Sequence, residues 1–156
     1  MSRNRGKPPS PEELQAYADG FNRSATLRAF GATLDFPEGK KVRAVLPVKP
    51  EQRGGMGMSH VNGAVIAGLF DLIIGCTGGL VDPTRRTATM QLSMSFERGL
   101  AGDRVTGEAW IDRVGGSTLF ASAVMLNEAG EVCARCQGVV RISTLAWDAG
   151  SSPAVN

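Results

Sequence analysis

The segment GAVIAGLFDLIIGCTGGL, residues 63–80, sets the architecture expected for this chain of 156 residues. It holds 18 residues and a single charge, which on length alone would make it a candidate membrane span. The charge of Asp71 at its midpoint and five glycines argue against that interpretation. A helix that is apolar nearly all round has to be buried on several sides. We therefore expect a long central helix with a curved sheet wrapped around it.

The flanking segments predict the rest of this architecture. After the helix the hydrophobic period changes to two, and turn residues separate further apolar runs, as in an antiparallel meander. Before it, a capping-box serine starts a short helix, and two apolar runs separated by turn residues predict a hairpin. The expected helix covers residues 10–19, and the expected strands cover residues 30–36, 41–48, 88–96, 105–111, 119–126 and 132–142. This order predicts an α+β fold class with a mostly antiparallel sheet.

Composition limits the organisation and the class of protein. A hydrophobic share of 42% and a charged share of 21% fit one globular domain, which we place at residues 10–146 between a disordered segment 1–9 and a flexible tail 147–156. The net charge of +2 is too small to indicate a nucleic-acid partner. Three cysteines and an N-terminal segment without an apolar run favour reduced thiols and a cytoplasmic location without a membrane partner.

Asp71 is the first candidate functional residue. An ionisable group within an apolar helix costs several kcal/mol, roughly, unless it is paired or used. Helical geometry places it on one face with small residues, namely Ala64, Ala67, Gly68 and Gly75, where a ligand or another backbone can approach closely. From periodicity alone, an aspartate that hydrogen-bonds the backbone or a buried partner, or that simply surfaces at an interface, is an equally good interpretation.

The N-terminus of the same helix offers a second candidate group. Asn62-Gly63-Ala64 follows a glycine-rich loop, so the Gly63 and Ala64 amides can point at a developing negative charge, as in an oxyanion hole. The alternative is an ordinary helix cap, because Asn is a preferred N-cap residue. Ala64 and Asp71 are roughly 10 Å apart along a helix. Cooperation between the two groups therefore predicts a two-fold dimer in which each subunit supplies one of them.

The segment NGAVIAGLFD, residues 62–71, resembles the His-Gly-Gly-(six residues)-Asp segment of hotdog-fold acyl-CoA thioesterases of the phenylacetate-degradation type. The resemblance continues through TMQLSMSF, residues 89–96, and covers most of residues 30–143. It implies a hotdog fold, assembly as a homodimer or a dimer of dimers, and hydrolysis of an acyl-CoA thioester with an aryl or medium-chain acyl group. It implies no cofactor apart from the coenzyme A carried by the substrate, and no metal.

The resemblance also assigns roles to individual residues. It implies that the Gly63 amide polarises the thioester carbonyl, that Asp71 of the opposing subunit acts as base or nucleophile, and that Thr89 orients the water. For Thr89, a solvated strand face is an equally good interpretation. Asn62 and Ala64 would lie beside the thioester, with Asn62 in place of the family histidine and Ala64 in place of the second glycine. Asn62 can donate a hydrogen bond to a carbonyl but cannot transfer a proton.

Several weaker signals complete the set of candidates. His60 is the only histidine, and a loop position is the favoured interpretation over a substrate contact. The pair Cys133 and Cys136 has CxxC spacing without a second pair, so we interpret it as structural. The departures at residues 62 and 64 also leave open a domain that binds acyl-CoA as a sensor or carrier without hydrolysing it. A hotdog hydratase is disfavoured, because no histidine follows an acid with hydratase spacing.

Overall fold

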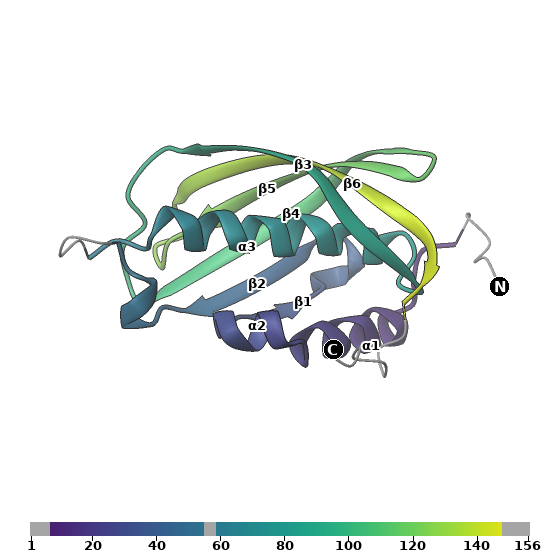
Figure 1. Cartoon of the computed structure of the whole chain (residues 1–156), viewed down its shortest axis with the longest axis horizontal. Helices are drawn as coiled ribbons and strands as arrows, with labels where there is room; N and C mark the ends of the chain where they lie inside the picture. The colour runs from purple at the N-terminus through teal and green to yellow at the C-terminus, as the bar shows by residue number, and fades with distance from the viewer. Residues whose placement is uncertain (1–6, 55–58, 148–156) are drawn as a thin grey trace, which may run out of the picture.

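The computed structural model describes residues 7–54 and 59–147 of the chain. One antiparallel sheet of six strands curls around the helix α3, with strand order β1-β2-β4-β5-β6-β3 (Figure 1). The helices are α1 (Pro11–Asn22), α2 (Ala25–Phe30) and α3 (Gly63–Cys76), the last continued by the 3-10 helix η3 (Thr77–Leu80). The strands are β1 (Thr33–Asp35), β2 (Val42–Pro47), β3 (Arg85–Phe96), β4 (Arg104–Gly115), β5 (Thr118–Leu126) and β6 (Val132–Ala146). This arrangement confirms the α+β hotdog fold predicted from the sequence.

Helix α3 forms because an apolar stripe and an N-cap coincide in the sequence. Its buried side chains face the concave side of the sheet and form the centre of the hydrophobic core: Ile66, Leu69, Phe70, Ile73, Ile74 and Cys76. Half of the segment Gly63–Leu80, which is long and apolar enough for a membrane span, is buried inside the structure. The opposite stripe is half-buried or exposed and carries the small residues together with Asp71.

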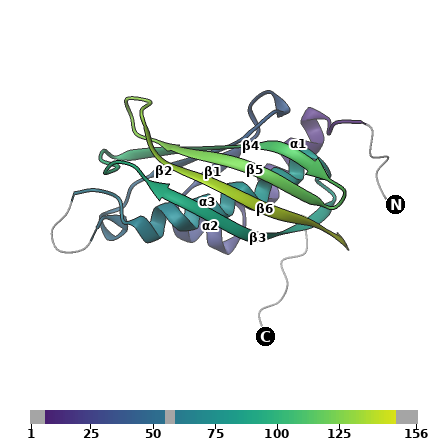
Figure 2. The ribbon, with the colours of Figure 1, turned by 90° about the horizontal axis from the view of Figure 1, so that it is seen from above.

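Strand β3 lies at one end of the sheet and pairs only with β6 (Figure 2). A register shift leaves Met90 outside the pairing, and this bulge reverses which face of the sheet the following residues occupy. Before it, the Thr87 hydroxyl points at α3 and donates a hydrogen bond of 2.9 Å to the Gly75 carbonyl. After it, Leu92 packs against the core. The alternation in residues 88–96 predicted the strand correctly, but its apolar residues do not share one face.

The N-terminal region differs from the prediction in one element. Residues 25–30 form α2, which Ser24 caps at its start and Gly31 ends with a left-handed φ of 79°. Phe30, predicted as the first residue of a hairpin strand, is therefore the last residue of a helix. The predicted hairpin itself is present as β1 and β2, which pair antiparallel.

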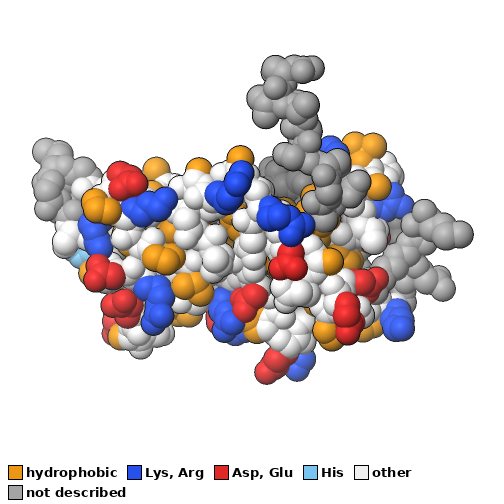
Figure 3. All heavy atoms as spheres, turned by 90° about the horizontal axis from the view of Figure 1, so that it is seen from below, with side chains coloured by type: hydrophobic (Ala, Val, Ile, Leu, Met, Phe, Trp, Pro, Cys, Tyr) orange, Lys and Arg blue, Asp and Glu red, His pale blue; other side chains and the backbone are white. Residues whose placement is uncertain are grey.

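The two ends of the chain meet at an aromatic cluster. Trp147, assigned to the tail by the sequence, packs against Tyr17 of α1 with a ring-centroid separation of 4.7 Å and stacks on Phe21. Residues 1–6 of the predicted N-terminal segment and residues 148–156 of the predicted tail lie outside the described residues. On the face formed by α1 and α2, acidic and basic side chains are interspersed (Figure 3), as the small net charge leads one to expect.

A substitution at Gly138 of β6 tests the close contact between the sheet and α3. A Cβ added there would lie 2.6 Å from Ile74 Cγ2 and 3.3 Å from the Gln91 carbonyl oxygen. We expect Gly138→Ala to lower the free energy of unfolding by about 1–3 kcal/mol, because either α3 or the strand has to move. Urea denaturation measures this change.

Gly115→Ala is the matched control, since its nearest neighbours would be 3.8 Å from the new methyl group. Its effect should stay within about 0.5 kcal/mol. An equal loss in both variants would contradict a specific steric conflict at Gly138.

Candidate active site at helix α3

The N-terminus of α3 carries one occupied and one open amide. Asn62 is the N-cap, and its side-chain oxygen accepts a hydrogen bond of 2.9 Å from the Ala64 amide. The Gly63 amide has no hydrogen-bond partner among the described residues, and Gly63 is exposed. The two interpretations of this segment, cap and oxyanion donor, therefore apply to different amides. One N–H group remains to bind a developing negative charge, with the helix dipole in its favour.

Backbone hydrogen bonds fix the position of this helix start. The Asn62 amide donates to the Gln52 carbonyl at 2.9 Å, and the Val61 amide donates to the Leu100 carbonyl at 2.9 Å. Arg53 adds bonds from its guanidinium to the Ser59 carbonyl and to the Asp103 carboxylate. The Gly63 amide therefore projects from a segment that is bonded on both sides.

Asp71 lies on the exposed stripe of α3, two turns beyond the helix start. Its carboxylate is exposed and makes no hydrogen bond or ion pair with any described residue. The structure thus provides no partner of the kind that a purely structural aspartate would have. Burial raises the pKa of the Cys136 thiol to about 11, and the nearby charge of Asp71 adds to this rise.

Thr89 and His60 lie at opposite ends of α3. The Thr89 hydroxyl faces Gly75 across the sheet–helix contact, 3.2 Å from where a Cβ would be, so it lies one turn beyond Asp71. The His60 ring packs against Gly99 in the connection between β3 and β4, and the His60 carbonyl accepts a bond from the Gly54 amide. The structure therefore places Thr89 near Asp71 and His60 near the helix start.

A single subunit keeps the amide and the carboxylate apart. Gly63 and Asp71 belong to one continuous helix, and eight residues separate them by about 12 Å along its axis. A thioester carbon bound at the Gly63 amide is therefore out of reach of the same chain's Asp71. This geometry agrees with the expectation that a second subunit supplies one of the two groups.

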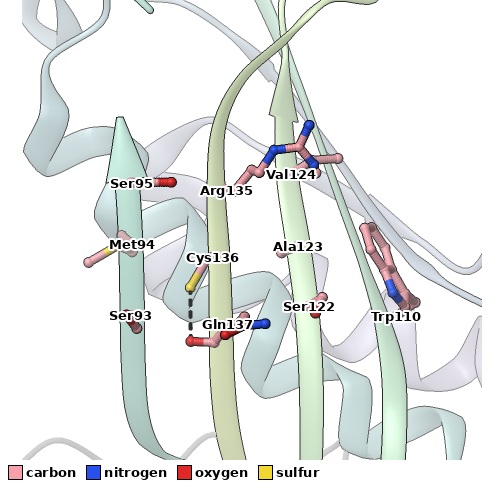
Figure 4. A pocket seen from close by; sticks show the side chains of 10 residues that line it. All are labelled: Ser93, Met94, Ser95, Trp110, Ser122, Ala123, Val124, Arg135, Cys136 and Gln137. Atoms are coloured by element: carbon pink, nitrogen blue, oxygen red, sulfur yellow. Dashed lines mark hydrogen bonds between the residues drawn. The ribbon is translucent and has the colours of Figure 1, made fainter. Parts of the chain in front are cut away.

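Two hollows in the described part of the chain lie away from these residues. One, of about 370 Å³, is lined by side chains of β3, β4, β5 and β6, among them Ser93, Trp110, Ser122 and Arg135 (Figure 4). The other, of about 460 Å³, lies between the start of α1 and Phe36. Neither is lined by a predicted site residue.

The cysteines of the CxxC pair lie in the core, and two arginines near the ends of β3 are engaged by neighbouring groups. Cys133 and Cys136 are buried and free. Arg98 forms an ion pair with Glu131 at 3.3 Å, and Arg85 donates to the Thr144 carbonyl, so both guanidinium groups are engaged. Among the described residues, no group of three or more His, Cys, Asp or Glu side chains is placed to hold a metal ion.

Two residues that flank this site had no role predicted from the sequence. Gln52 is buried and connects the helix start to α2, where its side-chain amide donates to the Phe30 carbonyl at 2.6 Å. The Phe30 ring covers Gly68 on the stripe that carries Asp71. For Phe30, the available sequence signal was the pair of caps around α2, namely the capping serine before the helix and the left-handed glycine after it.

Comparison with known proteins agrees with this fold. The family model described as "Thioesterase superfamily" matches residues 58–134, which include α3, Asp71 and β3. At the level of sequence, no curated protein matches the chain.

Solved structures share the fold at low sequence identity. A protein of Shewanella oneidensis related to the thioesterase superfamily has a TM-score of 0.75 and 21% identity, covering 85% of this chain and 96% of its own. A thioesterase of Haemophilus influenzae has a TM-score of 0.74 and 14% identity, covering 88% and 92%. The PaaI protein of the Escherichia coli phenylacetic acid degradation operon has a TM-score of 0.73 and 17% identity, covering 87% and 97%.

Substitutions at Asn62 test its bond to the Ala64 amide. We expect Asn62→Ala to lower the free energy of unfolding by about 1 kcal/mol, because the amide loses its cap. Asn62→Asp keeps an acceptor and places a negative charge at the helix start, so its stability should equal or exceed that of the wild type. Urea denaturation of the three proteins measures both effects, and a loss in Asn62→Asp equal to that in Asn62→Ala would contradict the capping role.

Proposed function

We propose that this chain, a hotdog-fold protein of the thioesterase superfamily, hydrolyses the thioester of an acyl-CoA to the free acid and coenzyme A. The observation that carries the proposal is the pair of free groups on α3: an open Gly63 amide at its start and an unpartnered Asp71 carboxylate on its exposed stripe. A ligand-binding domain gains little from an exposed carboxylate beside a thioester. Hydrolysis uses both groups.

In the proposed reaction, the thioester carbonyl oxygen accepts a hydrogen bond from the Gly63 amide, which stabilises the oxyanion as it forms. In the first route, Asp71 of the partner subunit takes a proton from water, the C–O bond to this water forms, the C–S bond breaks, and the leaving thiolate of coenzyme A receives the proton from Asp71. In the second route, Asp71 itself attacks the carbonyl carbon, the thiolate leaves, and water then hydrolyses the acyl–Asp71 anhydride to the free acid and supplies the proton of the thiol. Thr89, one turn from Asp71, orients the attacking water.

Asn62 and Ala64 flank the reacting carbonyl in this proposal. The Asn62 side-chain oxygen is engaged with the Ala64 amide, which leaves its NH₂ group as a donor for the substrate. His60, near the start of α3, is placed to contact the part of coenzyme A that follows the thioester. No metal or further cofactor takes part in the proposed reaction, and we place the protein in the cytoplasm.

The exposed edge of the sheet supports a homodimer. Strand β3 has 12 residues and an unpaired edge, whereas β1 at the other end has only three residues. Met90 and Phe96 of β3 are 63% and 54% exposed. A long edge with exposed apolar side chains is a template for pairing with a second copy. Pairing of two β3 strands would bring the α3 helices of both subunits together, and a dimer of dimers could form from such units.

Asp71→Asn tests the chemistry. We expect kcat/KM for phenylacetyl-, benzoyl- or medium-chain acyl-CoA to fall about a hundredfold or more, because the amide can neither accept the proton nor attack. Thiol release monitored with a trapping reagent measures the rate. Asp19→Asn on the exposed side of α1 is the matched control and should keep wild-type turnover. Tight acyl-CoA binding without turnover in the wild type would instead favour the sensor or carrier.

Mixed dimers test whether the two groups come from different subunits. Gly63→Pro removes only the candidate amide, because proline is favoured at the first helical position and Asn62 already has an extended backbone. We expect Gly63→Pro and Asp71→Asn each to be inactive as homodimers. Mixing them should restore about a quarter of wild-type activity, since half of the dimers then hold one intact site.

Subunit exchange is verified independently by the co-purification of untagged Asp71→Asn chains with affinity-tagged Gly63→Pro chains after mixing. Exchange without recovery in the Gly63→Pro mixture would show that both groups act within one chain. Sedimentation equilibrium of each variant verifies that the assembly is unchanged.

A further inference from the structure

We propose that Phe30 is a specificity-determining residue that limits the length of the acyl group in this site. The inference rests on the proposed thioesterase function and concerns the substrate class of the same site. It starts from one contact: a Cβ at Gly68 would lie 2.6 Å from Phe30 Cζ, so the edge of the phenyl ring lies directly on the backbone of α3. Only glycine admits an aromatic ring this close.

The ring occupies a defined position along the path of the acyl group. Gly68 is five residues beyond Gly63, about 7.5 Å along the helix axis from the amide that binds the thioester carbonyl. An acyl group that leaves this amide and follows the small residues Ala64 and Ala67 therefore meets Phe30. A phenylacetyl or medium-chain group fits into this length, whereas a long-chain group extends beyond it.

Phe30 is held in place by its backbone. Its carbonyl accepts the 2.6 Å bond from the buried Gln52 side chain, and the next residue, Gly31, ends α2 with two bonds back into the helix. The main-chain carbonyl of Gln52 also accepts a hydrogen bond from the Asn62 amide. Gln52 thus links the backbone of Phe30, through its side chain, to the start of α3, through its main-chain carbonyl.

The side chain itself is free to select ligands, because it is only partly buried. Phe30 packs against the core on one side and is half-buried overall. It is the large apolar residue beside the small-residue stripe on the α2 side of α3. Substitution by a smaller residue opens space next to Gly68 without removing a hydrogen bond.

The test compares acyl-chain profiles of the wild type, Phe30→Ala and Phe30→Leu. The measured quantity is the ratio of kcat/KM for dodecanoyl-CoA to that for hexanoyl-CoA. We expect this ratio to rise about tenfold or more in Phe30→Ala and by less in Phe30→Leu, because the space freed beside Gly68 lets more methylenes of the longer chain be buried. Phe120→Ala, which truncates an exposed ring of β5, is the matched control and should leave the ratio unchanged.

A merely structural role would change stability or overall activity, but not the ratio. If Phe30→Ala proves unstable, the kcat/KM ratio of Phe30→Leu is compared with that of the wild type, provided that the unfolding midpoint of Phe30→Leu is unchanged. An unchanged ratio in a folded, active variant overturns the inference and leaves the thioesterase proposal intact.

Failure of the proposed function gives a different result. If the wild type hydrolyses neither substrate, the same ratio is measured as binding affinity for the two acyl-CoAs by calorimetry. A shift of the affinity ratio in Phe30→Ala then supports the role of Phe30 in a binding protein, and an absence of shift or of binding overturns it.

Discussion

The burial of one face of α3 against the concave side of the sheet is the constraint on which the rest of the structure depends. Large side chains such as Phe70 and Ile73 fill the space between helix and sheet, and they determine how α3 is rotated about its axis. The residues of the opposite stripe then have to be small where other side chains approach the helix, and they can be polar where the stripe faces solvent. Gly68 admits Phe30 on this stripe, and Asp71 remains in solvent. The position of the carboxylate is therefore a consequence of core packing.

How much the sequence could predict follows from the range of the interactions involved. The periodicity of residues 63–80 and of the strands is local, and it predicted the helix, the meander and a curved sheet around the helix, whereas the hotdog fold was implied by the family resemblance. Helix α2 was missed because six residues are too few to show a helical period, and its caps are the only local signal. The bulge at Met90 was missed because it depends on the pairing of β3 with β6, which are distant in the sequence.

The same distinction applies to the site. Asp71 stood out as a lone charge in an apolar helix. The sequence argument assumed that this charge is buried and therefore needs a partner or a function, but the structure leaves the side chain exposed. The sequence could not decide between a cap and an oxyanion donor at residues 62–64, because both need the same residue types. The answer lies in side-chain geometry: Asn62 engages Ala64 and leaves Gly63 open. Gln52 and Phe30 could not be identified from sequence, because their contacts cross the fold.

Asn62, at the position of the family histidine, can take over the hydrogen bonds of a histidine but not its proton transfer. A neutral histidine can accept a hydrogen bond from the Ala64 amide with one ring nitrogen and donate a hydrogen bond with the other. Asparagine can make both hydrogen bonds, since its oxygen accepts and its NH₂ group donates. What asparagine lacks is a titratable proton. Proton transfer in the proposed reaction therefore rests on Asp71, and a carboxylate without a hydrogen-bond partner among the described residues is compatible with this role. In the proposal, its partner is the reacting water, held near the Gly63 amide of the second subunit.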